Sequence, residues 1–391
     1  MDQQFLYQID WTSGALVSAV KVWAVSIVIL SCVISWRVSA LIAFFKVAIV
    51  MAYFCWFADG TWFYGGDDYR YYELGMEFLA TGANPITIFH ESVTKWYFFA
   101  QTGYALQIFY NYLALYFLEP RYYSAVLGLV VINSLTVVLL VKCFRPSGRG
   151  EIYQSAFAIF LLLHWYTIAW TSFLDIKDPL VGLAMAFGIY LLSRFRSNPL
   201  VYGSAFLALM YSFHWLRFYF PAFFSASFLL SNVFVASLKM RLAFIVIALP
   251  VVVFLFWSHL SLAFKMSELH NLLYGLAHFL LQPAPWRITE PASYLFIPSV
   301  MHWLMAFPTF LGAVLIFNEK NEEGIEIGKL LLSVFMVGVL FYAAVPAIAS
   351  TRHRAPLDLL MAVMQFHFCW WVFEYWMKRI RVGINGKPGS R

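Results

Sequence analysis

An all-α fold, a polytopic bundle of transmembrane helices, is the class that this sequence predicts. Of its 391 residues, 62% are hydrophobic and only 12% are charged, a composition outside the range of soluble domains. The apolar residues form unbroken runs of about 20 residues, the length at which a helix crosses a bilayer. Membrane barrels show short alternating strands instead. We therefore expect about ten or eleven membrane-spanning helices.

The apolar runs, taken in chain order, place the predicted spans. They cover 15–36, 38–57, 123–142, 153–173, 179–194, 199–216, 219–238, 242–260, 294–317, 329–349 and 356–377. The first run contains Lys21, so it is either a true span with an outside N-terminus or a helix lying in the membrane interface. We favour the span.

Basic residues between the runs predict the orientation. If Lys142, Arg145 and Arg149 face the cytoplasm, alternation puts the other basic clusters on that side and most acids on the far side, as the positive-inside rule requires. The net charge of +6 is therefore explained by topology, and we expect no nucleic-acid partner. The four cysteines lie in or beside apolar runs without metal-site or disulfide spacing.

One transmembrane domain, 1–378, with a cytoplasmic tail, 379–391, accounts for the whole pattern. The first outside loop covers 58–122 and the second large one 261–293. Within the first loop, the moderately apolar piece 103–118 is interrupted by Gln107 and Asn111. We expect it to form a helix in the plane of the membrane, since a crossing there would reverse the topology.

Four polar patches fall on the outside ends of predicted spans. Charges at such positions are costly unless they are paired or solvated, so the patches are candidate site residues. Snorkelling side chains or fixed ion pairs are the alternative. The patches are Asp67/Asp68; Asp175, Lys177 and Asp178; His214 and Arg217; and Arg352, His353, Arg354 and Asp358.

The first patch lies in GGDDYRYYELG, residues 65–75. Gly65-Gly66 predicts a turn, Asp67 an N-cap, and the following residues a helix that ends at Thr81-Gly82. One cap explains one carboxylate, which leaves Asp68 to project toward a cleft. A carboxylate at a helix start is well placed to take a proton from an acceptor hydroxyl.

Four short motifs together resemble the GT-C superfamily of polyprenyl-phosphate-sugar-dependent glycosyltransferases, which includes the protein O-mannosyltransferases and the lipid A aminoarabinose transferases. They are WFYGGDDYRYY, IKDPL, LRFYFP and RHRAPLDLL, and the likeness covers roughly residues 38–378. Each motif is degenerate, and their order and common side of the membrane carry the likeness. The resemblance implies a GT-C-like bundle that transfers a sugar, with inversion, from an isoprenoid phosphate to an acceptor on the outer face.

The resemblance also implies roles for residues. Asp67 or Asp68 matches the family's catalytic base, and the cations Lys177, Arg217, Arg352 and Arg354 would hold the leaving phosphate. Further site candidates are Tyr71, Asp175, Asp178, His214 and His353. Carboxylates in these patches could ligate a divalent cation, Mg or Mn, but no spacing demands a metal site.

The expected partners are the polyprenyl-phosphate sugar, membrane lipids and a glycan, lipid or protein acceptor. The sequence has no Asn-x-Ser/Thr sequon, which favours a bacterial inner membrane with the site on the periplasmic side. Two departures from the family leave the acceptor open: the acidic pair is Asp-Asp where Asp-Glu is frequent, and no large soluble C-terminal domain follows. A polysaccharide polymerase or ligase, a flippase or transporter, and a non-enzymatic scaffold are the alternatives.

Overall fold

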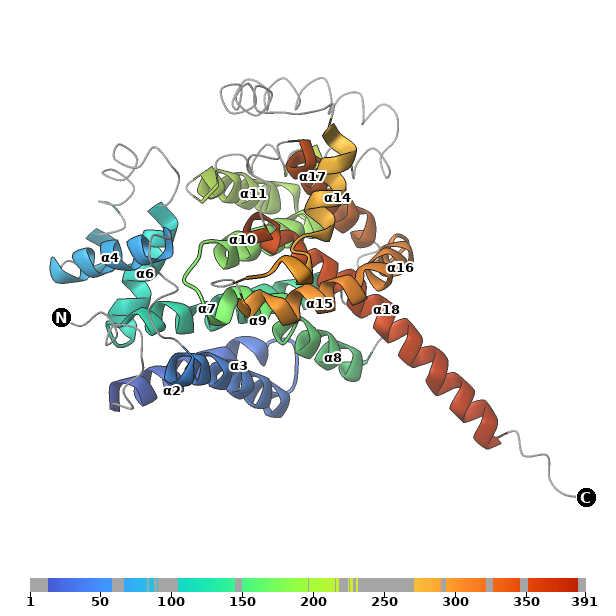
Figure 1. Ribbon diagram of the computed structural model, residues 1–391, viewed down its shortest axis with the longest axis horizontal. Coiled ribbons are helices and arrows are strands. Elements are labelled where there is room, and N and C mark those ends of the chain that lie inside the picture. Colours follow the sequence, from blue (N-terminus) through green and yellow to red (C-terminus); the bar gives the residue numbers. More distant parts are fainter. Residues whose placement is uncertain are drawn as a thin grey trace, which may run out of the picture.

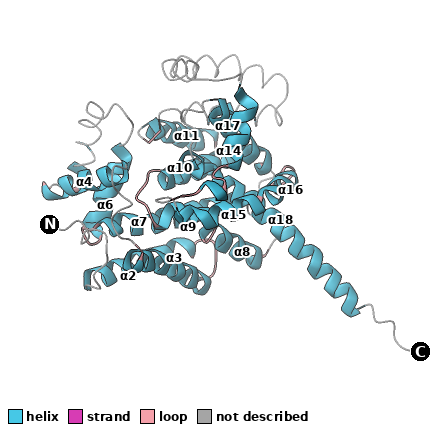
Figure 2. Ribbon diagram, in the orientation of Figure 1, coloured by secondary structure: helices cyan, strands magenta, loops and turns pink. Residues whose placement is uncertain are grey.

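The protein is helical throughout the part that the structure, a computed structural model, describes (Figure 1). The described residues are 13–57, 67–82, 84–87, 90, 105–144, 150–195, 197–214, 216–217, 224, 226–227, 230, 271–289, 293–320, 326–344 and 351–385. Figure 2 shows helices joined by loops, with no strand in these ranges. The predicted all-α class is confirmed for them.

Fourteen α-helices and two short 3-10 helices form the described part of the bundle. In chain order they are α2 (Ser13–Leu30), α3 (Trp36–Trp56), α4 (Asp67–Ala80), α6 (Ala105–Phe117), α7 (Tyr122–Cys143), α8 (Glu151–Leu162), α9 (Trp165–Ser172), α10 (Asp178–Arg194), α11 (Pro199–His214), α14 (Leu272–Leu281), η3 (Pro285–Arg287), η4 (Ser293–Leu295), α15 (Phe296–Leu304), α16 (Ala306–Ile316), α17 (Ile327–Ala344) and α18 (Thr351–Asn385).

Four of these helices are long and apolar enough to cross a membrane, and the number rises to six if each of two bent pairs is one span. The expectation of ten or eleven spans concerns the whole chain, of which the described residues show these four to six. Three predicted spans are the helices α2, α10 and α11, of 16–18 residues, which at 1.5 Å per residue reach about 24–27 Å, short of a bilayer core of about 30 Å. The predicted spans 219–238 and 242–260 lie outside the described residues, apart from 224, 226–227 and 230.

Two predicted spans are broken in the middle. Helices α8 and α9 meet at 49°, and α15 and α16 meet at 55°. Pro308 explains the second break, because a proline in the first turn of α16 cannot continue a preceding helix without a steric clash. At the first break, His164 takes an extended backbone, with ψ 136°. Averaged apolarity finds such segments but does not find where their helices bend.

Helix α7 lies at the centre of the described bundle. It packs against α2, α3, α8, α9 and α10, and its apolar side chains contribute to two of the hydrophobic cores. Helix α18 packs on α16, α10, α8 and α9. At Gly312 on α16, an added Cβ would overlap the Met364 carbonyl of α18, so the two backbones touch directly. The far end of α18 extends beyond the bundle at the lower right of Figure 1.

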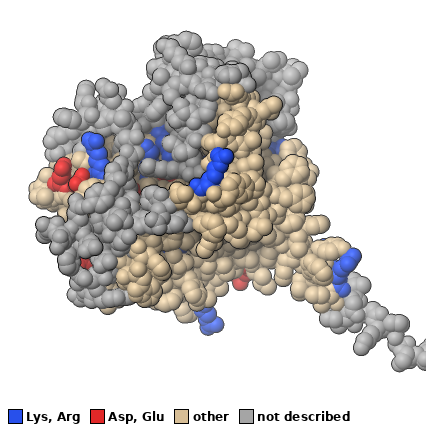
Figure 3. Space-filling model, viewed as in Figure 1, with Lys and Arg blue, Asp and Glu red and all other residues tan. Residues whose placement is uncertain are grey.

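The first predicted outside loop contains two helices, as expected. α4 begins at Asp67 and ends before Gly82, which has φ +66°, a left-handed conformation that glycine adopts easily. α6 matches the predicted helix 103–118 and packs between α4 and α7. The acidic side chains at the left of Figure 3 lie over α4, whose Glu73 and Glu77 are exposed.

Helix α2, which the sequence left open between a span and an interfacial helix, packs along α3 and α7. The Lys21 ammonium donates a hydrogen bond to the Phe117 carbonyl at the end of α6 (2.9 Å). The Lys21 ammonium therefore lies against the first predicted outside loop. The predicted tail boundary at 378/379 falls inside α18, which continues to Asn385.

Candidate functional site

The start of α10 buries three candidate residues, Asp175, Lys177 and Asp178. Asp178 is the first residue of the helix and Pro179 the second. Proline is well tolerated there because the first helical N–H groups have no intrahelical acceptor, and a carboxylate at this end is stabilised by the helix dipole. The sequence KDPL therefore fixes both the helix start and the position of its carboxylate.

Arg217 forms an ion pair with Asp178, and both side chains are almost completely buried. Its other terminal nitrogen donates to the Tyr342 hydroxyl of α17 at 3.3 Å. Taking two charges out of water is costly unless they pair and keep further hydrogen bonds. The predicted second and third patches thus meet in one buried pair.

Asp175 links this region to the first predicted outside loop. Its carboxylate accepts a hydrogen bond from Gln107 of α6 at 2.8 Å, and its backbone N–H donates to the Tyr122 hydroxyl at 3.1 Å. Burial raises the pKa of Tyr110, also on α6, well above its usual value, and the nearby charge of Asp175 raises it further. Gln107, which interrupts an apolar stretch in the sequence, therefore has a buried hydrogen-bond partner in this carboxylate.

Arg354, near the start of α18, is 1% exposed and surrounded by acceptors. Its Nε donates to Asp358 at 2.8 Å, and its Nη2 donates to the Tyr166 hydroxyl of α9 at 2.5 Å. Its Nη1 donates to the carbonyls of Phe279 (2.9 Å), Leu280 (3.3 Å) and Gln282. Arg354 therefore ties α18 to α9 and to the end of α14, and its guanidinium has little capacity left for a ligand in this arrangement.

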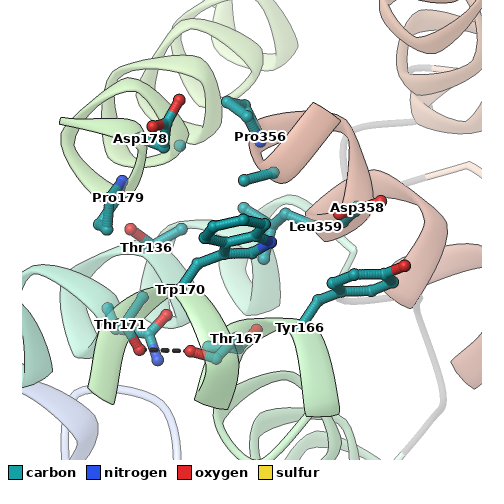
Figure 4. A pocket seen from close by; sticks show the side chains of 13 residues that line it. Thr136, Tyr166, Thr167, Trp170, Thr171, Asp178, Pro179, Pro356, Asp358 and Leu359 are labelled. Carbon is teal, nitrogen blue, oxygen red and sulfur yellow. Dashed lines mark hydrogen bonds between the residues drawn. The ribbon is translucent and has the colours of Figure 1, made fainter. Parts of the chain in front are cut away.

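A hollow lies between the two ion pairs (Figure 4). Its cavity volume is about 40 Å³, and it has an open mouth. Its lining comes from four helices: Asn133 and Thr136 of α7; Tyr166, Thr167, Trp170 and Thr171 of α9; Asp178, Pro179 and Gly182 of α10; and Ala355, Pro356, Asp358 and Leu359 of α18. Figure 4 shows the Trp170 ring between Thr136 and Leu359, with Asp178 and Pro356 on the far side.

Three buried polar atoms in this lining have no hydrogen-bond partner within the described part of the chain. They are Oδ2 of Asp358, Nδ2 of Asn133 and Nε1 of Trp170. Buried polar atoms are normally paired, so we expect each of these orphan atoms to form a hydrogen bond with water or a ligand. The hollow is consequently a polar site in a largely apolar bundle.

The structure brings together three of the four predicted patches. Asp178, Arg217, Arg354 and Asp358 come from segments far apart in the sequence and meet around the hollow. The side chains of Asp67, Asp68, His214, Arg352 and His353 lie outside the described residues. Tyr71, on α4, is buried and is not among the residues that line the hollow.

Sequence reasoning missed the uncharged members of the site. Asn133 and Thr136 are three residues apart on α7, and Thr167 and Thr171 are four apart on α9. Each spacing puts two polar side chains on one face of a helix. That polar face within an apolar span was the available signal, although a span can tolerate hydroxyls that bond back to its own carbonyls.

A second polar region lies at the bend between α8 and α9. Lys46 of α3 is fully buried and donates to the Thr167 carbonyl at 3.2 Å. The ring of His164 contacts the Gln365 side chain at 2.9 Å, and that amide donates to the Thr309 hydroxyl of α16 at 2.8 Å. Ionisable groups within membrane helices are rare and mark functional positions.

No three His, Cys, Asp or Glu side chains come together as metal ligands in the described ranges. No protein-family model, curated protein or solved structure matches this chain. Membrane insertion is supported by its apolar helices.

Proposed function

We propose that this protein is a membrane glycosyltransferase that moves a sugar, with inversion, from a polyprenyl phosphate to an acceptor hydroxyl on the non-cytoplasmic face. The observation that carries the proposal is the hollow, where the carboxylates of Asp178 and Asp358 meet the indole of Trp170. Carboxylates accept hydrogen bonds from sugar hydroxyls, and aromatic rings pack on sugar faces. This lining therefore suits a carbohydrate. Its position among membrane helices suits a donor carried on a lipid.

Charge balance supports a reaction in which a lipid phosphate leaves. The carboxylates at the hollow are each paired with an arginine, so the site is close to neutral before the donor binds. Lys177, the N-cap residue of α10, is the cation to which we assign phosphate contact, because a helix start adds N–H donors that favour anions. Arg217 and Arg352 remain further phosphate candidates.

Arg354 has a different role in this proposal from the one that the motif suggests. Its donors already engage Asp358, Tyr166 and three carbonyls. We therefore propose that it shapes the wall of the donor site and orients Asp358. Direct phosphate binding would require it to exchange those partners.

Asp67 or Asp68, at the start of α4, is proposed as the base that activates the acceptor. α4 packs on α6, and α6 supplies the amide that holds Asp175. The helix with the acidic pair is thus coupled, through one intervening helix, to the start of α10. A divalent Mg or Mn ion bound by these carboxylates is compatible with the proposal but is not required by it.

The test is transfer of sugar by the purified full-length chain in lipid nanodiscs, supplied with a radiolabelled polyprenyl-phosphate sugar and candidate acceptors. Asp67→Asn or Asp68→Asn should abolish transfer. Glu73→Gln and Glu77→Gln, exposed acids on the same helix, are matched controls that should leave it unchanged. Full activity in both aspartate variants would instead favour a polymerase or ligase that needs no acidic base, and no transfer by the wild-type chain would contradict the proposal.

One feature favours a second function, movement of the lipid-linked sugar across the membrane. Transporters often use broken helices and ionisable residues near the midplane, and the described part of this chain has two bent helix pairs and a fully buried Lys46. Liposomes that contain the protein would distinguish the two. Translocation of a fluorescent lipid-linked sugar without any transfer, lost in Lys46→Met, would support the transporter.

A further inference from the structure

The orphan atoms of the hollow define what it can bind. Asp358 Oδ2 is an acceptor that has no donor within the described residues, whereas Asn133 Nδ2 and Trp170 Nε1 are donors without an acceptor there. The three residues are 1%, 4% and 5% exposed, respectively, so bulk water does not satisfy them. A ligand that satisfies all three must offer both donors and acceptors within one small volume.

The hydroxyls around the hollow add acceptors. Thr136 donates its own hydroxyl hydrogen to the Ile132 carbonyl at 2.9 Å, and Thr171 donates to the Thr167 carbonyl at 2.5 Å. With their hydrogens turned toward the helix, these oxygens keep lone pairs for a donor on the ligand. Acceptors, including the carboxylates of Asp178 and Asp358, therefore predominate on the polar wall.

The cations of the region stand behind this wall. Arg217 and Arg354 contact the two carboxylates, Lys46 donates to a backbone carbonyl, and Lys177 directly precedes Asp178. Within the described part of the chain, none of these four is among the residues that line the hollow. A ligand in the hollow thus faces carboxylate oxygens directly. A ligand carboxylate offers no donor to them and would meet like charge.

We propose that this hollow binds the ring of the transferred sugar, and that it selects a sugar rich in hydroxyl or amino donors and rejects one that carries a carboxylate. The inference rests on the proposed function and adds the class of sugar. Hydroxyls are both donors and acceptors, so adjacent ring hydroxyls match Asp358, Asn133 and Trp170 together. Pro356, Leu359 and Gly182 leave an apolar side for the C–H face of the ring.

Binding of short-chain donors to the purified full-length protein tests this directly. The probes are citronellyl phosphate alone and its glucose, glucosamine and glucuronic acid derivatives, which share one lipid and one phosphate. In calorimetric titrations into nanodiscs, the glucose and glucosamine derivatives should bind at least about tenfold more tightly than the other two, because buried polar groups left unpaired penalise the wrong ligand.

Two conservative variants locate the effect. Trp170→Phe keeps a ring and removes the N–H, and Asn133→Leu keeps the volume and removes the amide. Each should cut the glucose advantage over citronellyl phosphate about tenfold and leave the affinity for citronellyl phosphate itself unchanged. Trp286→Phe, at a tryptophan that is 71% exposed and outside the lining, is the matched control and should bind like the wild-type chain.

Each other outcome has a defined meaning. Equal binding of all four probes would overturn the sugar inference and leave a lipid-phosphate site, as the proposed function requires. Tight sugar binding that neither variant weakens would show that the hollow holds only water, which overturns the inference as well. Tighter binding of the glucuronic acid derivative would reverse the proposed selectivity, and no binding by any probe would overturn both proposals.

Discussion

Replacing Arg354 with lysine separates a wall-forming role from a phosphate-binding role. Lysine keeps the positive charge but loses the planar fork, so the change is not conservative where several acceptors surround one guanidinium. A lysine nitrogen could retain Asp358 or one carbonyl. It would lose the bond to the Tyr166 hydroxyl and at least two of the carbonyls of Phe279, Leu280 and Gln282.

The magnitude follows from the lost bonds. Three hydrogen bonds from a charged donor, each worth about 1–2 kcal/mol net, give a destabilisation of about 3–5 kcal/mol. Backbone exchange should rise most at residues 280–289, because their anchor to α18 is weakened. The assay is thermal unfolding in detergent, combined with hydrogen–deuterium exchange resolved by mass spectrometry.

Donor affinity in the same variant provides the contrast. If Arg354 held the phosphate directly, lysine would weaken donor binding because it loses the bidentate fork, and the fold would be unaffected. An Arg354→Lys protein with wild-type unfolding temperature and unchanged exchange at 280–289 would refute the wall-forming role. Asp358→Asn, which keeps an acceptor for Nε and removes only charge, should be milder than Arg354→Lys.

Three further predictions concern the fold and its orientation. Asp178→Asn should lower stability by about 3 kcal/mol, since it leaves Arg217 buried without its counter-charge; unfolding temperatures unaltered by the change would argue against a buried pair. Gly312→Ala should cost about 1–3 kcal/mol because its Cβ overlaps the neighbouring α18 backbone, while Gly182→Ala, inside α10 with only the Leu359 side chain nearby at 3.8 Å, should not be destabilising in the same melts. In a cysteine-free background, an impermeant maleimide added to intact cells should label cysteine at Gly82 and not at Gly150; equal labelling would contradict the predicted orientation.

Sequence patterns located, for a physical reason, the three polar patches that the structure brings together. Asp178, Arg217 and Arg354 stand out because a charge beside an apolar run is costly and rarely accidental. Their partners were not evident. That Arg217 would choose Asp178, and Arg354 the carbonyls at the end of α14, depends on how α10, α14 and α18 pack.

The sequence did not predict where the spans bend, and the reason is equally physical. Mean apolarity over a window indicates that a segment avoids water, but it carries no information about where the backbone changes direction. It therefore read 153–173 and 294–317 as single spans, although His164 and Pro308 bend them. Gln107, which interrupts an apolar piece, is evidence from the sequence against a crossing, and the structure shows it bonded to the buried Asp175 carboxylate.

The sequence by itself determined that this protein is helical and apolar enough to enter a membrane, and where its charges fall along the chain, since these follow from composition and local periodicity. Only the tertiary structure decided which charges neutralise one another and that Asn133, Trp170 and Asp358 share one hollow. Hydrogen bonds between buried groups require close contact and defined angles, and those are set by the packing of helices that lie far apart in the chain.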